Sequence, residues 1–224
     1  MSKQPIVLVF GGSGGIGSCI ADRFLQQNVE LILPTRSDCD LSSSSSIETY
    51  LTSLTQTPDV VIHAAGVNQP RDLNILTPEI WHRVFQINFF APLQIMSHLA
   101  ELQAKKGGGN HIIISSLYAE KSRAGRAAYS ASKAALESAV RSFTLEYGAR
   151  KVKFGIVQPG FIETSMTRQN NSQSKIDEIV SRIPLGRLGS GHDIANLVAF
   201  MASVDSEYLN GVTIKIDGGY SVAG

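Results

Sequence analysis

Short apolar runs alternate with longer amphipathic segments along this chain of 224 residues, and that alternation restricts the fold more than any other feature. The runs are rich in Val, Ile and Leu without period-two alternation, which predicts strands buried on both faces. The predicted strands are 6–10, 30–33, 60–63, 111–115, 153–157 and 213–216. The predicted helices are 16–27, 47–54, 78–88, 92–105, 127–149, 174–182 and 192–201. This order predicts an α/β fold, a doubly wound parallel sheet of six or seven strands with helices on both faces.

Length and composition fit one domain and exclude several classes of function. The chain is long enough for one sizeable core, and no repeat or linker divides it, so residues 1–224 are expected to form a single domain. A formal charge of +1 gives no basic field for nucleic acid. No apolar run approaches the roughly 18 residues of a membrane helix, and no signal-peptide pattern is present. Cys19 and Cys39 make neither a disulfide framework nor a metal-ligand cluster, which indicates a reduced, cytoplasmic setting and no metal site.

The segment GGSGGIG lies between the first predicted strand and the first predicted helix. Glycines there let the backbone approach a phosphate closely, and the helix N-terminus offers free N–H groups to that anion. Two templates fit the letters: Gly12, Gly14 and Gly17 make GxGxxG, whereas Gly11, Gly15 and Gly17 make GxxxGxG. A tight structural turn would also fit, so a dinucleotide site needs support from other segments.

A tyrosine and a lysine stand four residues apart in the segment YSASK, on a predicted helix. This spacing puts Tyr129 and Lys133 on one helix face, near enough for the ammonium to lower the pKa of the phenol. Ser116 and the segment HAAG follow two other predicted strands, where open α/β sheets bind their ligands. Each feature alone also has an ordinary structural explanation, such as a surface tyrosine beside a solvated lysine. Together with the glycine loop they predict one site.

Taken in order, these segments resemble the short-chain dehydrogenase/reductase family. The resemblance covers nearly the whole chain, through FGGSGGIG, HAAG, QIN, SS, YSASK, QPGFIET and IDGG. It implies a Rossmann fold and hydride transfer between a nicotinamide and a carbonyl or alcohol. The family's loop reads Thr-Gly-x-x-x-Gly-x-Gly, so the resemblance selects Gly11, Gly15 and Gly17 and leaves Gly12 and Gly14 as permissive insertions.

The resemblance implies a catalytic tetrad of Asn88, Ser116, Tyr129 and Lys133. Tyr129 would protonate the carbonyl oxygen, and because a free phenol titrates at roughly 10 it would need the charges of Lys133 and of the oxidised nicotinamide at neutral pH. Ser116 would orient the substrate oxygen, and Lys133 would also hold the nicotinamide ribose. Asn88 would help carry a water chain that resupplies the proton. Alone, Asn88 would also fit a cap at the end of a helix.

The resemblance also implies contacts to the cofactor at several strand ends. These residues are Gly11, Ser13, Gly15, Ile16, Gly17, Arg36, Asp40, Leu41, Ala64, Ala65, Gly66, Tyr129, Lys133, Pro159, Gly160, Ile162 and Thr164. Ile162 by its backbone and Thr164 by its hydroxyl would hold the carboxamide. The family normally has a helix and a further strand before the Asp40-Leu41 pair that brackets adenine. Here only a few residues intervene, which implies that this helix is absent and the family's third strand is reduced or missing.

An arginine after the second predicted strand bears on the choice of cofactor. In LPTRSDCDL, Arg36 stands roughly where an acid binds the ribose 2′-OH in folds that prefer NAD. A guanidinium suits the 2′-phosphate of NADP, with Ser13 and Ser37 available to help, so NADP(H) is favoured and NAD(H) is the alternative. Asp38 is the counter-evidence, because a small shift of the strand end would bring its carboxylate to that place. Arg36 would also fit a solvated loop charge.

Four positions depart from the family pattern without touching the tetrad. Phe10 replaces the threonine that braces the loop, and Gln158 replaces an asparagine before Pro-Gly. His63 and Ala64 replace the two asparagines of NNAG, whose amides tie neighbouring strands together. We expect His63 to be a structural residue at a strand end.

The substrate is less well defined by the sequence. The polar segment TSMTRQNNSQSK at 164–175 predicts the start of a mobile substrate lid over about 164–185. PLGRLG and NGVTIKIDGG are similar to 3-oxoacyl-carrier-protein reductases, which implies reduction of a 3-oxoacyl thioester or related ketone, free or carrier-bound. Arg123 and Arg126 either meet an acidic group of the substrate or are solvated.

Two other functions stay open from the sequence: an NAD-dependent alcohol or sugar dehydrogenase, and a catalytically silent dinucleotide-binding sensor. The intact tetrad argues against the sensor. The resemblance also implies a homodimer or homotetramer assembled through the helix after Pro92 and the helix that carries Tyr129. Apolar residues recur every three to four positions on the second of these helices and fit either the core or an interface. They are Leu136, Val140, Phe143 and Tyr147.

Overall fold

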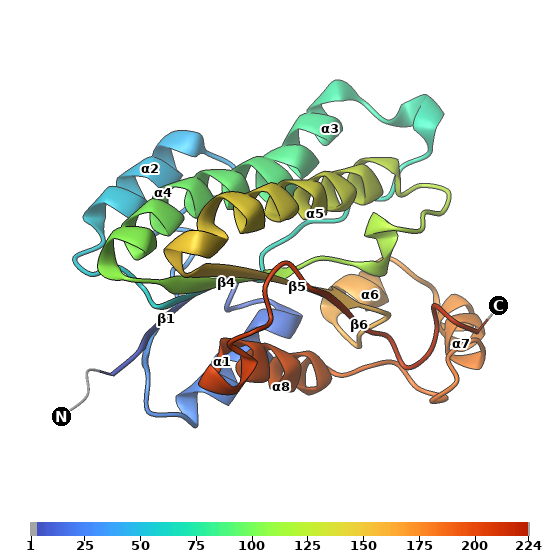
Figure 1. Ribbon diagram of the computed structural model, residues 1–224. Coiled ribbons are helices and arrows are strands. Elements are labelled where there is room, and N and C mark those ends of the chain that lie inside the picture. Colours follow the sequence, from blue (N-terminus) through green and yellow to red (C-terminus); the bar gives the residue numbers. More distant parts are fainter. Residues whose placement is uncertain (1–3, 224) are drawn as a thin grey trace.

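A computed structural model describes residues 4–223 and shows one six-stranded sheet between two layers of helices (Figure 1). The strands are β1 (Ile6–Phe10), β2 (Glu30–Ile32), β3 (Val60–His63), β4 (Gly109–Ile114), β5 (Val152–Pro159) and β6 (Thr213–Ile216). Their order across the sheet is β2-β1-β3-β4-β5-β6, and every neighbouring pair is parallel. The predicted doubly wound parallel sheet is confirmed, and all carboxyl ends meet at one edge.

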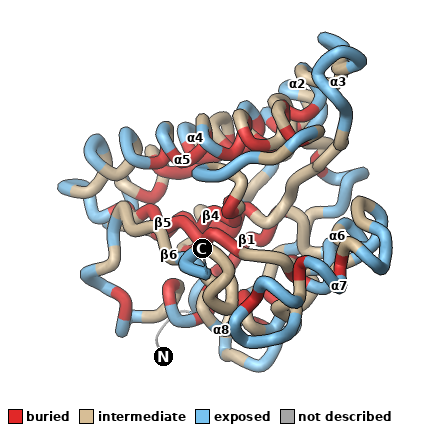
Figure 2. Tube along the Cα trace, turned by 90° about the vertical axis from the view of Figure 1, so that its right-hand side faces the viewer, coloured by how far each residue is buried: buried red, intermediate tan, exposed pale blue. Residues whose placement is uncertain are grey.

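Helices cover both faces of the sheet (Figures 1 and 2). On one face α1 packs against α8, and on the other α4 packs against α2 and α5. Two short helices, α6 and α7, lie beyond the carboxyl ends of β5 and β6. The helices are α1 (Gly15–Leu25), α2 (Ser44–Ser53), α3 (Pro78–Phe85), α4 (Ala91–Lys106), α5 (Ala127–Tyr147), α6 (Ser165–Gln169), α7 (Gln173–Ser181) and α8 (Gly191–Ala202).

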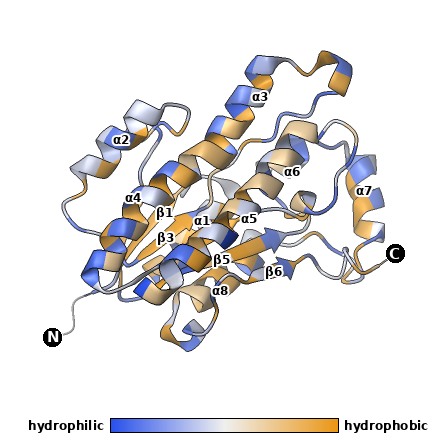
Figure 3. Cartoon of the chain, turned by 45° about the horizontal axis from the view of Figure 1, so that its top comes forward, coloured by the Kyte–Doolittle hydropathy of each residue, from blue (hydrophilic) through white to orange (hydrophobic). Residues whose placement is uncertain are grey.

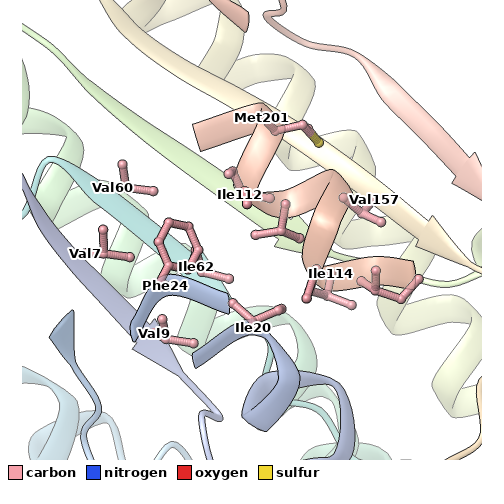
Figure 4. Packing of buried hydrophobic residues seen from close by; sticks show 14 of the residues in the cluster. Val7, Val9, Ile20, Phe24, Val60, Ile62, Ile112, Ile114, Val157 and Met201 are labelled. Atoms are coloured by element: carbon pink, nitrogen blue, oxygen red, sulfur yellow. The ribbon is translucent and has the colours of Figure 1, made fainter. Parts of the chain in front are cut away.

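Alternate side chains of the buried strands enter separate cores on the two faces of the sheet. Val7 and Val9 of β1 pack with Phe24 of α1 in the core shown in Figure 4. Leu8 and Phe10 of the same strand pack on the opposite face, against α2 and α4. Burial of each such side chain contributes about 1.5–3 kcal/mol. Because both faces are covered, these strands read as continuous apolar runs, orange in Figure 3.

The edge strand β2 confirms the predicted loss of one helix and one strand. Within residues 33–59, all of which the structure describes, the chain forms a single helix, α2, before it enters β3. The sheet therefore ends at β2, which pairs only with β1.

Two segments differ from the sequence prediction. The helix predicted over 78–88 ends at Phe85 and continues as a π-helical turn, Gln86–Phe90, that leads directly into α4. The segment 164–175, predicted to begin a substrate lid and to hold no helix before residue 174, contains α6, whose first turn is capped by the Thr164 hydroxyl accepting from the N–H of Thr167. Among residues 4–223 no helix combines the length and apolarity needed to cross a bilayer.

Candidate active site

Two adjoining cavities open at the carboxyl edge of the sheet. One, of about 580 Å³, follows the glycine loop, and the other, of about 470 Å³, lies beside α5. Every residue predicted for the site lines one or both of them, except Asn88. The residues common to both cavities are Ile16, Ala64, Ala65, Gly66, Thr164 and Met166.

Close packing distinguishes the glycines of the loop from one another. A Cβ on Gly17 would overlap the carbonyl oxygen of Gly11. Gly11 itself has φ +84° and would place a Cβ 2.6 Å from the backbone nitrogen of Ala65, and a Cβ on Gly15 would lie 2.8 Å from the Thr164 methyl carbon. The other two glycines of the loop meet looser or movable neighbours. The backbone therefore depends most on the GxxxGxG set that the family resemblance selects.

The N-terminus of α1 faces this loop without a side-chain cap. Gly14 is the N-cap residue, and the first turn contains no acidic side chain. The free N–H groups of that turn and the partial positive charge of the helix suit an anion. A loop that only glycine can form, in front of an uncapped helix, fits the pyrophosphate of a dinucleotide.

Arg36, rather than Asp38, lines the glycine-loop cavity. The Arg36 side chain is 77% exposed and makes only a long contact, 3.4 Å, to the Asp40 carboxylate. The Asp38 carboxylate accepts from both the N–H and the hydroxyl of Thr35, and these bonds lower its pKa. Asp38 is thus occupied within its own turn, and Arg36 keeps donors for a ligand.

The π-helical turn buries Asn88 at the junction of β3 and α5. Its side-chain oxygen accepts from the N–H of Val67 at 2.8 Å, and its amide nitrogen donates to the Val67 carbonyl at 2.9 Å and to the Ser132 hydroxyl at 3.0 Å. A Cβ on Gly66 would lie 3.4 Å from the Asn88 oxygen and 3.6 Å from the Lys133 nitrogen, so these two groups are close neighbours. Asn88 braces the loop after β3 against the helix that carries Lys133. Its predicted part in a water chain stays a prediction.

Tyr129 and Lys133 lie on the face of α5 that lines the second cavity, together with Ser116. Burial raises the pKa of Tyr129, and the interaction with the Ser116 hydroxyl opposes that rise. Arg126 is the cation that opposes this rise, and the predicted lowering by Lys133 together with the charge of an oxidised nicotinamide stays a prediction. The Lys133 ammonium donates to the Ile114 carbonyl at 2.8 Å, and burial lowers its pKa to about 8.

Glu137 belongs to the same buried face, and sequence reasoning did not find it. It stands one turn beyond Lys133, and its carboxylate accepts from the Ser115 hydroxyl and from the Gln158 amide. Its charge raises the pKa of Lys133 against the effect of burial. The available signal was the continued spacing of four residues, Tyr129-Lys133-Glu137, which keeps all three side chains on one face of α5.

The segment after β5 forms the wall opposite the glycine loop. Gly160 is needed because a Cβ there would lie 2.6 Å from the Cβ of Asp217. The Ile162 carbonyl accepts from the Thr167 hydroxyl at 2.6 Å, and Thr164 caps α6. The predicted bonds from these two residues to a carboxamide stay predictions. In the part of the chain from 4 to 223, no three His, Cys, Asp or Glu side chains gather as metal ligands.

Comparison with known proteins gives the same picture over nearly the whole chain. A family model described as enoyl-(acyl carrier protein) reductase matches residues 35–221. The 3-oxoacyl-[acyl-carrier-protein] reductase of Escherichia coli (strain K12) is 29% identical over 238 residues, which cover 97% of this chain and 97% of that protein. The (3R)-3-hydroxyacyl-CoA dehydrogenase of Mus musculus is 33% identical over 163 residues, or 72% of this chain and 62% of that protein.

Solved structures share the fold. A 4-hydroxyisoleucine dehydrogenase mutant complexed with NADH and succinate superposes with a TM-score of 0.93 at 24% identity, over 97% of this chain and 98% of the other. A gluconate 5-dehydrogenase from Burkholderia cenocepacia J2315, in complex with NADP and tartrate, has a TM-score of 0.89 at 20% identity, over 100% and 97%. With the family model matched over residues 35–221, the chain belongs to the short-chain dehydrogenase/reductase family of oxidoreductases.

Proposed function

We propose that this protein reduces a carbonyl to an alcohol with NADP(H), the substrate being a 3-oxoacyl thioester or a related ketone. One observation carries the proposal. Ser116, Tyr129 and Lys133 line a cavity that shares a wall with the cavity along the glycine loop. A dinucleotide in the loop and a ketone beside α5 would therefore meet at that wall. The E. coli relative, a 3-oxoacyl-[acyl-carrier-protein] reductase, supports the substrate class.

The residues of the chain have distinct parts in this reaction. A bound nicotinamide dinucleotide supplies the hydride. The Tyr129 hydroxyl, which is protonated at neutral pH, donates its proton to the substrate oxygen. The Ser116 hydroxyl orients that oxygen, and the Lys133 ammonium stabilises the phenolate that remains. Asn88 holds the loop after β3 so that Lys133 keeps its place.

Arg36 supports NADP(H) over NAD(H), because its exposed guanidinium lines the cavity where Asp38 does not. The alternative is an NAD-dependent dehydrogenase acting on an alcohol or sugar. It is favoured by the Asp40 carboxylate, which lines the same cavity and would suit a ribose 2′-OH. Among the structural neighbours one is complexed with NADH and another with NADP.

A substrate panel followed by nicotinamide absorbance tests this function. It contains an acetoacetyl thioester, aliphatic and aromatic ketones, and simple sugars, each with NADPH and with NADH. We expect turnover of ketones, with a lower KM for NADPH that Arg36→Ala raises about tenfold or more, because a charge-assisted fork to phosphate is lost. The KM for NADH should stay within about twofold. An unchanged cofactor preference would remove Arg36 from the site, and absence of turnover with every ketone and alcohol would favour the silent sensor.

Assembly as a homodimer or homotetramer is part of the proposal. The sequence left four apolar residues of α5 open between the core and an interface. Leu136 and Val140 are buried in the core of one subunit, and Phe143 and Tyr147 pack against that core. An interface would therefore use side chains such as Phe90 and Leu145, which are 50% and 85% exposed. Sedimentation should show a particle of at least twice 24.1 kDa, and a monomer at all concentrations would contradict it.

A further inference from the structure

Arg126 is a buried cation whose charge has no partner within the described part of the chain. It precedes the first residue of α5, and the residue is only 4% exposed. Its Nε and Nη1 atoms have no hydrogen-bond partner among residues 4–223, and its Nη2 makes one long contact, 3.4 Å, to the carbonyl of Asn170. A buried guanidinium is normally paired, because an unpaired charge in a protein interior is costly. Arg126 is therefore arranged for a group that the chain itself does not supply.

The surroundings of Arg126 increase this excess of positive charge. The nearby guanidinium of Arg123 lowers the pKa of Arg126, as burial also does. The single carboxylate in the wall of this cavity, among the described residues, is Glu178, and it is paired with Lys175 at 2.6 Å. The cations in the wall are Lys121, Arg123, Arg126, Lys133, Lys175 and Arg182. The cavity thus attracts an anion.

The position of Arg126 assigns that anion to the substrate rather than to the dinucleotide. Arg126 lines the cavity beside α5 and does not line the cavity along the glycine loop. It stands three residues before Tyr129 at the N-cap of α5, lines the same cavity, and is near enough for its charge to act on the Tyr129 phenol. A group held by Arg126 therefore lies a few bonds from the carbonyl that Tyr129 would protonate.

We propose that the substrate carries a free carboxylate that the Arg126 guanidinium binds, so that the enzyme acts on an oxo acid and the corresponding hydroxy acid. This rests on the proposed carbonyl reduction. A guanidinium presents a planar fork of N–H donors that matches a carboxylate, and it can bind a phosphate in the same way. A cavity of about 470 Å³ holds a small organic acid. Within the class of ketones proposed above, Arg126 selects those with a negative charge near the carbonyl.

Matched acids and esters test the assignment. The panel contains 4-oxopentanoate, 3-oxobutanoate, the methyl ester of each, an acetoacetyl thioester and dihydroxyacetone phosphate. We expect kcat/KM for the acids to exceed that for their esters at least tenfold. Arg126→Met should raise KM for the acids roughly ten- to a hundredfold, the range for a lost bond to a charged group, and leave KM for the esters within about twofold, while any change of kcat through the pKa of Tyr129 is shared by acids and esters. Arg126→Lys should recover part of the loss, because it keeps the charge without the fork.

A control variant and a binding measurement complete the test. Arg141→Met removes one positive charge from an exposed position of the same helix and should leave all KM values within about twofold. In thermal unfolding with the dinucleotide bound, 4-oxopentanoate should raise Tm of the wild type and not of Arg126→Met. Without ligand, the Tm of Arg126→Met should equal or exceed that of the wild type, because an unpaired buried charge is removed.

The outcomes separate this inference from the proposed function. If the esters or the thioester are reduced at the same rate as the acids and Arg126→Met has no effect, the carboxylate site is overturned. The proposed reductase activity then stands. A preference for dihydroxyacetone phosphate over both acids would assign the site to phosphate instead and overturn the carboxylate. Protection by 4-oxopentanoate that depends on Arg126, without turnover of any ketone, would support the site and contradict the reductase. A large loss of Tm in Arg126→Met without ligand would show a structural role and also overturn the inference.

Discussion

Two opposing effects set the pKa of Lys133, and one of them comes from the Glu137 carboxylate. Burial lowers the pKa of Lys133 to about 8, and the Glu137 carboxylate pulls it upward. A lysine in this range loses its charge just above neutral pH, so activity that needs the ammonium should decline as pH rises through about 8.

Glu137→Gln should therefore move the alkaline limb of activity to lower pH. The substitution removes the charge that favours protonated Lys133, so the pKa of Lys133 falls further below 8. The measurement is kcat/KM against pH for both proteins. A side chain with a merely structural role would lower the whole profile without moving its alkaline limb, and that result would contradict the account.

From the sequence, strand-end position placed the glycine loop and Ser116 in one candidate site, helix spacing placed Tyr129 beside Lys133, and the family resemblance implied their roles. The sequence left the state of Arg126 open between a substrate contact and a solvated charge. The burial of this arginine depends on how the Asn170 segment folds over the start of α5. Such packing between distant segments leaves no periodic signal in the chain.

At the scale of elements, two histidines join β3 to β4 inside the sheet. His63 Nε2 lies 3.1 Å from His111 Nδ1, and the two rings stack between Phe10 and Phe154. Burial lowers the pKa of His63 to about 3 and also lowers that of His111. The geometry fits the expected structural role of His63.

The histidine pair should make the fold sensitive to acid. Both imidazoles are neutral in the folded chain, whereas in the unfolded chain each binds a proton near its ordinary pKa of roughly 6.5. The unfolded state then holds more protons, so this contribution to stability is complete above about 6.5 and is lost as pH falls toward 3.

Urea denaturation at pH 7.5 and at pH 4.5 measures this effect. We expect the urea concentration at the unfolding midpoint to be lower at pH 4.5 than at pH 7.5. The decrease should be smaller in His63→Asn than in the wild type. His82→Gln, at an exposed position, is the control and should follow the wild type. Equal pH dependence in wild type and His63→Asn would contradict the account.

Strands were the elements that the sequence predicted best, since burial on both faces gives continuous apolar runs. β5 extends past the predicted end because Gln158 and Pro159 pair with β6 although neither continues the apolar run. α6 was not predicted, because its five residues include a single apolar one, Met166, and so carry no apolar stripe. The π-helical turn could not be predicted either, because its residue Asn88 forms hydrogen bonds with Val67, which is distant in sequence.

At the scale of the whole molecule, the site depends on four strand ends meeting at one sheet edge. The glycine loop follows β1, HAAG ends β3, Ser116 follows β4 and the Pro-Gly segment ends β5. Parallel pairing brings these segments together, and α5 adds Tyr129 and Lys133 from the face above the sheet (Figure 1). The order of these segments made the fold predictable, and the short connection through α2 leaves the sheet without a further strand beyond β2.

The central claim is that the Tyr129 hydroxyl donates the proton beside a bound dinucleotide. Tyr129→Phe removes that proton and leaves the glycine loop and Lys133 in place. The decisive measurement is ketone turnover by this variant, together with its Kd for NADPH by fluorescence titration. We predict a loss of kcat of at least a hundredfold, the range for a general acid, with Kd within about threefold of the wild type. Turnover at the wild-type rate with normal binding would contradict the account.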